Sequence, residues 1–254
     1  MDLQLHSRVA LVTGSDRRTG EIIASTLKRE GATVIVHGNT DMPQSELAVC
    51  GDLAEDQGCA QVLTQLLDLG LRVDILVNNF GSTDQHYWSD SDTAKWLEMY
   101  QINTLSAMRM ARGLAPAMRD ARWGRIINLS TIGAHQPLAV RPAYYAAKGA
   151  LANLTVSLAQ ELSGSGVTVN AIAPGLIRTE QVERMYRAKA VRRGWGDDWA
   201  EIEQRVIETE FPNPCGRMAT REEVADLVAF IASERAAYIN GQNIRIDGGA
   251  VTYV

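Results

Sequence analysis

The chain has 254 residues, of which 46% are hydrophobic and 22% are charged, and its formal net charge is −5. A chain of this length can bury a full hydrophobic core. The acidic balance argues against binding to nucleic acid or to an anionic membrane, since both call for a basic surface, and no apolar run approaches the roughly 18 residues that span a bilayer.

The few cysteines and histidines argue against disulfide and metal sites, and the first residues bear on where the protein is located. Cys50, Cys59 and Cys215 are too few and too widely spaced for a disulfide framework or a zinc site. The four histidines are scattered, so we expect no metal site. The opening stretch lacks the basic region, the long apolar region and the small-residue cleavage site of an export signal. We therefore expect a cytoplasmic protein.

Taken in chain order, short apolar runs alternate with segments of helical spacing. The run over 8–14 is rich in β-branched residues and ends in a turn residue, which is typical of a buried strand. Segment 20–31 has its apolar residues at helical spacing and ends in Gly31, a residue that suits the position after a helix. By the same criteria the sequence predicts strands over 32–38, 47–53, 73–81, 124–130, 167–175 and 242–249, and helices over 56–70, 93–120, 141–162 and 220–233.

Strands and helices that alternate in this way predict an α/β fold, a doubly wound parallel (Rossmann-type) sheet with helices on both faces. No repeat or linker divides the chain, so we expect a single domain over 1–254. The exception to the alternation is 180–214, a long polar segment with two tryptophans. It is either a surface decoration or a lid, and its place just after a strand favours a substrate lid.

The turn after the first strand, "VTGSDRRTGEII", predicts a dinucleotide site. A strand, a glycine-bearing turn and a helix together present backbone N–H groups and the helix dipole to a pyrophosphate. Gly14 and Gly20 occupy the outer glycine positions, Arg18 replaces the middle glycine, and Thr19 lies directly before Gly20. Arg17 and Arg18 would repel the positive end of the helix unless an anion lies there.

The end of the second strand indicates which dinucleotide is bound. NAD-binding proteins tend to place an acidic residue here, against the ribose 2′-hydroxyl. This chain has Gly38 and Asn39 instead, and Asp41 comes later. Two arginines without a carboxylate suit a 2′-phosphate, so we favour NADP(H), with NAD(H) as the other possibility. The alternative is that both arginines simply face solvent.

Polar residues also follow the third and fourth predicted strands, at the edge where a cofactor would lie. Asp52 and Leu53 lie at the end of the third strand, and Asn79 and Gly81, with Asn78 and Phe80, lie at the end of the fourth. Asp52 could instead cap the next segment, and the asparagine could serve only the turn.

Tyr144 and Lys148 lie four residues apart in the helix predicted over 141–162, so they share one face. Tyr145 is offset from that face. A phenol has an ordinary pKa near 10, and a nearby ammonium favours its ionised form. The spacing predicts that Lys148 acts on Tyr144, although such a pair also arises by chance on helices.

Several motifs occur together and in order: "VTG…G", "DL", "NNxG", a helical asparagine, a serine or threonine, "YxxxK", "PGxxxT" and "DGG". Over nearly the whole chain this series resembles the short-chain dehydrogenase/reductase family. The resemblance implies that Tyr144 exchanges a proton with a carbonyl or alcohol substrate and that Lys148 holds the nicotinamide ribose. It also implies that Asn103 anchors a water of the proton relay.

The resemblance further implies a hydroxyl that orients the substrate carbonyl. That position falls on Thr131, with Ser130 as the second candidate. The "RR-x-G" turn and "QPL" before the tyrosine are similar to the pteridine reductases, although those usually carry aspartate at the Thr131 position. A pterin substrate is thus one alternative to a general carbonyl substrate.

Two further segments match the family. Pro174, Gly175, Ile177 and Thr179 resemble its turn against the nicotinamide carboxamide, although Pro-Gly after a strand is also a common stop signal. The strand over 242–249 is expected at a sheet edge, which must be covered. In this family it packs at a subunit contact, so the resemblance implies a homotetramer or homodimer.

Two hypotheses outside catalysis stay open at this point. The missing middle glycine and the missing serine are compatible with a catalytically silent NADP(H) sensor, or with a partner-binding protein that no longer binds nucleotide. Trp88, Trp195 and Trp199 either pack the lid or contact the ligand. Arg141, Arg178 and the pair at 192–193 could attract an acidic substrate, although surface arginine is usually only solvated.

Overall fold

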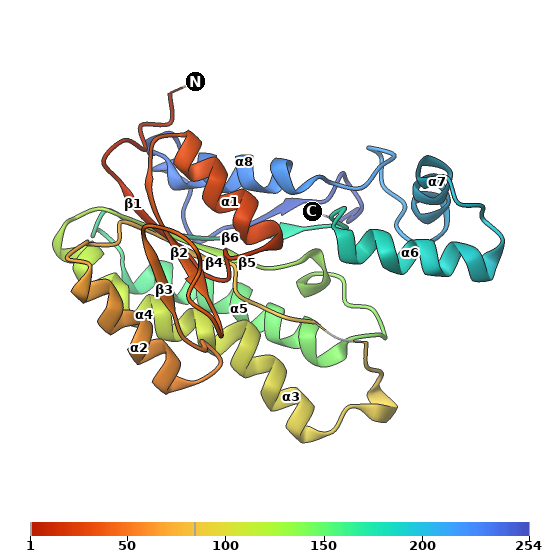
Figure 1. Ribbon diagram of the computed structural model, residues 1–254, viewed down its shortest axis with the longest axis horizontal. Helices are drawn as coiled ribbons and strands as arrows, with labels where there is room; N and C mark the ends of the chain where they lie inside the picture. The colour runs from red at the N-terminus through yellow and green to blue at the C-terminus, as the bar shows by residue number, and fades with distance from the viewer. Residues whose placement is uncertain (1, 84, 254) are drawn as a thin grey trace.

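The fold was analysed in a computed structural model that describes residues 2–83 and 85–253, so Met1, Asp84 and Val254 of the predicted domain lie outside the described residues. Seven parallel strands form one sheet in the order β3-β2-β1-β4-β5-β6-β7 (Figure 1). The strands are β1 (Val9–Val12), β2 (Thr33–Gly38), β3 (Ala48–Cys50), β4 (Ile75–Asn78), β5 (Gly124–Leu129), β6 (Val167–Pro174) and β7 (Asn243–Ile246). The predicted doubly wound parallel sheet is confirmed.

Helices cover both faces of this sheet. They are α1 (Arg18–Arg29), α2 (Asp56–Asp68), α3 (Thr93–Tyr100), α4 (Ser106–Asp120), α5 (Pro142–Glu161), α6 (Glu180–Arg193), α7 (Trp199–Thr209) and α8 (Arg221–Ala232). The helix predicted over 93–120 contains a π-helical turn, Gln101–Leu105, which separates α3 from α4. Hydrophobic spacing could not distinguish this turn from α-helix because the apolar positions continue through it.

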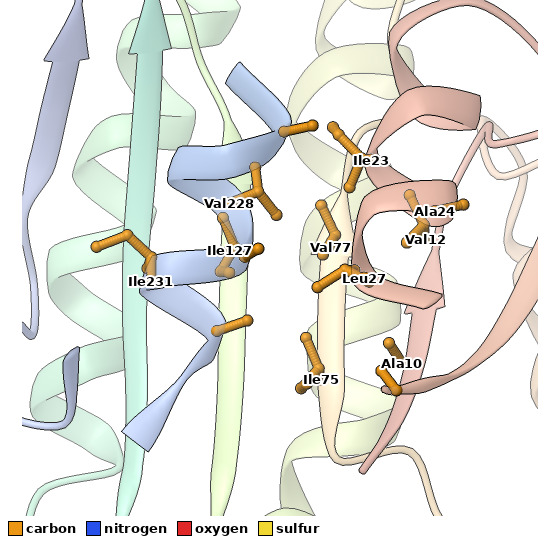
Figure 2. Close-up of a cluster of buried hydrophobic side chains, with 14 of the residues drawn as sticks. Ala10, Val12, Ile23, Ala24, Leu27, Ile75, Val77, Ile127, Val228 and Ile231 are labelled. Atoms are coloured by element: carbon orange, nitrogen blue, oxygen red, sulfur yellow. The ribbon is translucent and has the colours of Figure 1, made fainter. Parts of the chain in front are cut away.

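Successive residues of the central strands point to opposite faces of the sheet, and each face has its own hydrophobic core. Ala10 and Val12 of β1 point to one side of the sheet, where they pack with Ile23 of α1 and Val228 of α8 (Figure 2). Leu11, between them, packs on the other side with residues of α2 and α4. This two-sided burial is the reason the strands read as continuous apolar runs.

The segment 180–214 contains two helices, which its polar sequence did not predict. It forms α6 and α7, which extend away from the sheet (Figure 1). The two helices have a small core of their own, formed by Tyr186, Ala190, Ile202, Val206 and Ile207, with Met218 of the following segment. Trp195 and Trp199 are half-buried against this core, which favours the packing role for these two tryptophans.

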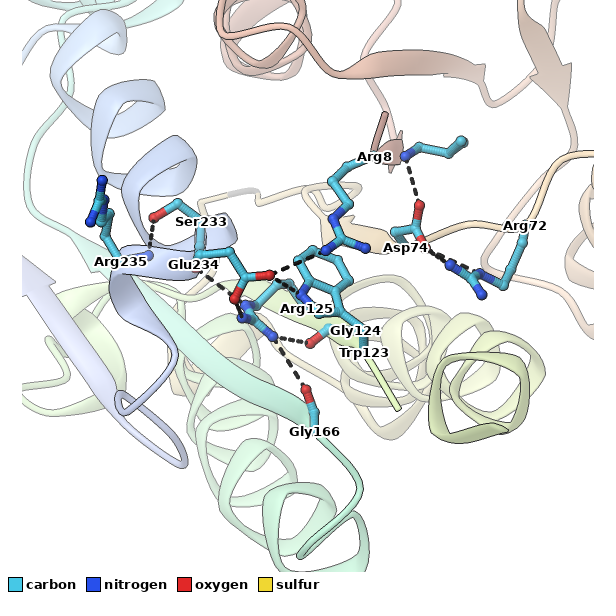
Figure 3. Close-up of polar contacts among 11 residues, drawn as sticks. Arg8, Arg72, Asp74, Trp123, Gly124, Arg125, Gly166, Ser233, Glu234 and Arg235 are labelled. Carbon is cyan, nitrogen blue, oxygen red and sulfur yellow. Dashed lines mark hydrogen bonds and ion pairs between the residues drawn. The ribbon is translucent and has the colours of Figure 1, made fainter. Parts of the chain in front are cut away.

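A buried arginine lies near the start of β5, at the sheet edge opposite the strand ends that carry the predicted site. Arg125 is 2% exposed, donates from Nη1 to the Gly124 carbonyl at 2.8 Å, and lies 3.4 Å from Glu234 Oε2 (Figure 3). Arg8 also pairs with Glu234 at 3.2 Å, and both guanidiniums lie over the Trp123 ring. One carboxylate therefore balances two cations, one of them fully desolvated.

Replacing Glu234 by glutamine is expected to lower the free energy of unfolding by about 2–3 kcal/mol, because it leaves the buried Arg125 charge uncompensated. The loss should fall short of that for a fully buried pair, since the Glu234 side chain is 35% exposed. Urea denaturation measures the difference. Glu180→Gln is the control: it breaks only the surface pair with Arg221, and should cost less than about 1 kcal/mol. Equal losses in the two variants would contradict the role given to burial.

Candidate active site

A cleft of about 390 Å³ opens at the carboxyl ends of the central strands. Its volume lies within the range of small-molecule sites. The predicted residues that line it are Arg18, Thr19, Asn79, Gly81, Asn103, Ser130, Tyr144, Lys148, Pro174 and Ile177. A second hollow, of about 130 Å³ beside Phe211 and Asp247, contains neither Tyr144 nor Lys148. These ten predicted residues therefore meet at one place, from six different segments, whereas Gly175 lines the second hollow.

The first turn is closed around its two glycines. Gly14 has φ +61°, a left-handed conformation that glycine adopts without cost. A Cβ on Gly20 would lie 2.3 Å from the Gly14 carbonyl oxygen and 2.5 Å from Asn79 Nδ2, which leaves no room for a side chain. Asn79 Nδ2 donates to the carbonyls of Thr13 and Gly14 at 2.9 and 3.0 Å. Asn79 thus fixes the first turn with its amide group and also lines the cleft, so its part in cofactor binding stays a prediction.

The two arginines of this turn lie differently. Arg18 has φ +58° and lines the cleft. It occupies the position of the missing glycine and takes the backbone conformation that glycine favours, at a steric cost. Arg17 is exposed and lies 3.6 Å from Asp16. Arg18 is therefore the better candidate for an anion, and Arg17 already has a carboxylate partner.

Three predicted cofactor residues lie at the ends of β2 and β3 and do not line the cleft. Asn39 Oδ1 accepts a hydrogen bond from the Leu53 backbone N–H at 3.2 Å, which ties the two strand ends together. Leu53 is buried, and exposed Asp52 accepts from the Ala54 N–H at 2.9 Å. Asn39 and Asp52 therefore make local hydrogen bonds within this edge.

The tyrosine pair separates into two roles. Tyr144 lines the cleft together with Lys148. The Tyr145 ring packs on Gly133, where a Cβ would lie 2.0 Å from the ring. Pro142 at the start of α5 has the fixed φ that a first helical turn requires, so the helix begins just before the pair. The geometry agrees with the choice of Tyr144 made from spacing.

Burial raises the pKa of Tyr144 to about 12, and the neighbouring Tyr145 contributes in the same direction. The Arg141 charge and a hydrogen bond with the Thr131 side chain act against this rise. The sequence argument weighed the lysine charge and not burial, so its expectation of a more acidic phenol differs from the structure. At neutral pH the hydroxyl is a protonated donor, the form needed to give a proton to a carbonyl oxygen.

Lys148 is 4% exposed, and its Nζ donates to the Leu129 carbonyl at 2.6 Å. Burial lowers the pKa of this amine to about 8. A Cβ on Gly81 would come within 3.4 Å of the same Nζ, so glycine at this position keeps the approach to the ammonium open. The amine is therefore mostly charged at neutral pH and faces the cleft.

The two hydroxyl candidates are both close to the pair. Ser130 lines the cleft, is 7% exposed, and donates to the Lys148 carbonyl at 3.4 Å. Thr131 accepts from the Gly133 N–H at 3.3 Å and also bonds the Tyr144 side chain. Thr131 is thus the hydroxyl in contact with the proton donor, whereas Ser130 has the larger share of the cleft wall. Which of them orients a substrate stays a prediction.

Asn103 lies in the π-helical turn, a type of distortion that is frequent at functional sites. It is 1% exposed and lines the cleft. Its Nδ2 donates to the carbonyls of Ser82 and Met99 at 2.9 and 3.1 Å, and its Oδ1 accepts from the Ser82 N–H at 3.3 Å. The side chain holds the loop after β4 against α3, and its predicted relay role stays a prediction.

The turn after β6 contributes backbone and apolar contacts. Pro174 and Ile177 line the cleft. Gly175 lies close to Phe211, since a Cβ would meet that ring at 2.8 Å. Thr179 caps α6, and its hydroxyl accepts from the Val182 N–H at 3.2 Å. Thr179 therefore has a capping role, and its contact with a nicotinamide stays a prediction.

Sequence reasoning missed four residues that line the cleft: Ser82, Thr83, Leu129 and Gln181. The polar residues directly after Gly81 could have suggested the first two. Leu129 acts through its backbone carbonyl, which no side-chain pattern reveals. Gln181 is on α6, so segment 180–214 reaches the cleft, which supports its assignment as a lid.

Across residues 2–83 and 85–253, no helix combines the length and the hydrophobicity needed to cross a membrane.

Comparisons with known proteins cover the whole fold. A family model described as Enoyl-(Acyl carrier protein) reductase matches residues 15–251. An acetoacetyl-CoA reductase of Rhizobium meliloti is 36% identical over 253 residues, 96% of this chain and 98% of the relative. The L-sorbose reductase of Gluconobacter frateurii, complexed with NADPH and L-sorbose, has a TM-score of 0.91 at 31% identity and covers 100% of both chains. A 3-oxoacyl (acyl-carrier-protein) reductase of Agrobacterium tumefaciens with NADP bound has a TM-score of 0.85 at 30% identity, covering 97% of this chain and 95% of that one.

Proposed function

This chain belongs to the short-chain dehydrogenase/reductase family, as its motifs indicated, and on that premise we propose that it reduces a small carbonyl compound with NADPH. It is an oxidoreductase of the CH–OH/C=O class. The observation that carries the finer proposal is the convergence of Tyr144, Lys148 and the Gly14–Gly20 turn on one cleft.

The residues present fit a dinucleotide phosphate. Gly20 lies where any Cβ would collide with the Gly14 carbonyl and Asn79, so glycine allows the start of α1 to pack this close to the end of β1, the arrangement in which a helix N-terminus binds a pyrophosphate. Arg18 lines the same cleft. Among the described residues no carboxylate pairs with it, so its charge is available to a 2′-phosphate. The structural relatives with bound NADPH or NADP support the choice of NADP(H) over NAD(H).

When bound, NADPH supplies a hydride to the carbonyl carbon. The chain's own residues handle the proton. Tyr144 donates it to the carbonyl oxygen, and the Thr131 hydroxyl holds the phenol in place. The Lys148 ammonium lies in the same cleft as a buried positive charge, which stabilises negative charge developing nearby more strongly than it would in water.

A panel of carbonyl compounds assayed with NADPH and with NADH tests this function. We expect NADPH oxidation with at least one small ketone, aldehyde or ketose. Turnover restricted to dihydropterins would favour the pteridine reductase alternative. NADPH binding without turnover of any compound would favour the silent sensor, and a preference for NADH would overturn the cofactor assignment.

Arg18→Gly is expected to raise the Kd of NADPH about 10–100-fold, because it removes a charge-assisted contact to the 2′-phosphate. Glycine suits the left-handed backbone at this position, so the fold should be retained. The Kd of NADH should stay near its wild-type value. Arg17→Gly is the matched control, with a smaller effect because Arg17 already lies beside Asp16. Titration of tryptophan fluorescence measures the Kd of both cofactors for the wild type and for each variant, and an equal loss for both cofactors in Arg18→Gly would contradict the assignment.

Two expectations about context remain proposals. β7 forms one edge of the sheet, and an edge strand requires cover, which supports a homodimer or homotetramer. A cytoplasmic location also remains a proposal, supported by a cysteine content that suits a reducing compartment.

A further inference from the structure

Arg141 has a backbone conformation that its neighbours make costly. Its φ and ψ are +64° and +43°, in the left-handed region that non-glycine residues rarely occupy. It also precedes Pro142, and proline restricts the residue before it to extended conformations. The Arg141 N–H donates to the His86 carbonyl at 2.6 Å, which helps to hold this geometry. Strain of this kind persists where the surrounding structure enforces it, often at functional sites.

The guanidinium of Arg141 lacks a partner among the described residues. Its Nε is buried and makes no hydrogen bond, and the side chain forms no ion pair with residues 2–83 or 85–253. A buried donor without an acceptor is rare in folded proteins and costs free energy. Arg178, another candidate from the sequence, pairs with Glu183 at 3.5 Å and lies over Trp199. Arg141 therefore differs from Arg178, whose charge has a carboxylate partner.

Arg141 is the N-cap residue at which α5 begins, the helix that carries Tyr144. Arg141 precedes Tyr144 by three residues, and its charge lowers the pKa of both Tyr144 and Tyr186 of α6. The carboxylate nearest to Tyr186 is Glu210, which already bonds the Tyr186 hydroxyl and pairs with Lys189. Glu210 thus has partners of its own and leaves Arg141 available to a ligand.

We propose that Arg141 binds an anionic group of the substrate, a carboxylate or a phosphate, next to the carbonyl that Tyr144 protonates. This inference rests on the proposed reductase function and deepens it. An anion placed there would accept a hydrogen bond from the buried Nε and neutralise the guanidinium. The substrate would extend from the cleft toward α6, with the carbonyl at Tyr144 and the acidic end at Arg141. Arg141 is then a specificity-determining residue and takes no part in the proton transfer.

Matched substrate pairs test the proposal. Acetoacetate is compared with methyl acetoacetate, and dihydroxyacetone phosphate with dihydroxyacetone, each with NADPH at saturation. The wild-type enzyme should favour the anionic member of at least one pair by about 10–100-fold in kcat/KM, the value of a charge-assisted hydrogen bond. The pair that shows the preference distinguishes a carboxylate from a phosphate. In Arg141→Gly the preference should disappear, mainly through KM of the anion.

The variant is chosen so that folding does not obscure the result. Glycine relieves the left-handed strain at position 141, so Tm should equal or exceed that of the wild type. Arg193→Gly removes the same charge from an exposed position on α6 and should keep the anion preference. A wild-type enzyme without preference, or an Arg141→Gly variant that loses activity equally on both members of a pair, overturns the proposal.

A binding measurement separates this proposal from the reductase function itself. If no compound of the carbonyl panel is turned over, the reductase proposal fails; in that case, or if neither matched pair is turned over, anion binding is measured directly. Acetoacetate and inorganic phosphate are titrated into the protein, and the fluorescence of its five tryptophans is followed. Binding that Arg141→Gly weakens at least about tenfold supports the anion site. Equal binding by both proteins, or none by the wild type, overturns it.

Discussion

Replacing Tyr144 by phenylalanine is expected to lower kcat/KM for carbonyl reduction by about 10²–10⁴-fold, the usual contribution of a positioned proton donor. The substitution removes one hydroxyl and keeps the ring, which packs against Met99, Ala143 and Ala147, so the fold should persist. Burial raises the pKa of this hydroxyl to about 12, which keeps it protonated over the neutral range. Steady-state NADPH oxidation with any accepted carbonyl measures the loss.

Tyr145→Phe is the matched control for this prediction. Its ring packs on Gly133 and its hydroxyl has no assigned part in the chemistry, so the variant should keep most of its activity. NADPH binding, followed by fluorescence, should be similar in both variants. A Tyr144→Phe enzyme with near wild-type kcat/KM would show that another group gives the proton and would remove the central assignment of this site.

The sheet could be predicted from the sequence because its signal is local and repeated. Each central strand is buried on both faces, so runs such as Ile75–Asn78 are apolar throughout and end where the turn begins. The helices α1 and α8 were equally visible, since each carries one apolar face toward the sheet. The helices α6 and α7 were missed because they pack mainly on each other, and a two-helix cluster of this size leaves a largely polar sequence.

For the site, the sequence could predict which side chains come together, but not their protonation or the backbone conformations around them. Tyr144, Lys148 and Asn103 share the cleft as the motifs indicated. The raised pKa of Tyr144 could not be predicted, because it depends on burial that several segments create together. The left-handed backbone conformations of Arg18 and Arg141 could not be predicted either, because in a sequence only glycine or asparagine indicates such a conformation.

Replacing Lys148 by methionine is the second large prediction, and the size of the loss should depend on pH. At pH 7 the variant should lose about 10²–10³-fold in kcat/KM, the cost of removing one electrostatic contact to the reacting centre. Since burial lowers the pKa of Lys148 to about 8, the amine of the wild type loses its charge as the pH rises through that value. Reduction by the wild type should therefore decline above pH 8, and Lys148→Met should lack that decline.

The pH dependence of the free energy of unfolding tests the pKa of Lys148 independently of activity. In the unfolded chain Lys148 titrates near 10.5, whereas burial holds its pKa at about 8 in the folded protein. Between these values the unfolded state binds more protons, so the free energy of unfolding of the wild type rises with pH, by up to about 3 kcal/mol from this residue. The difference between wild type and Lys148→Met, measured by urea denaturation at pH 7 and pH 10, isolates this contribution because other groups cancel. A difference that stays constant with pH would mean that Lys148 keeps an ordinary pKa and that its charge is not held buried beside the Leu129 carbonyl.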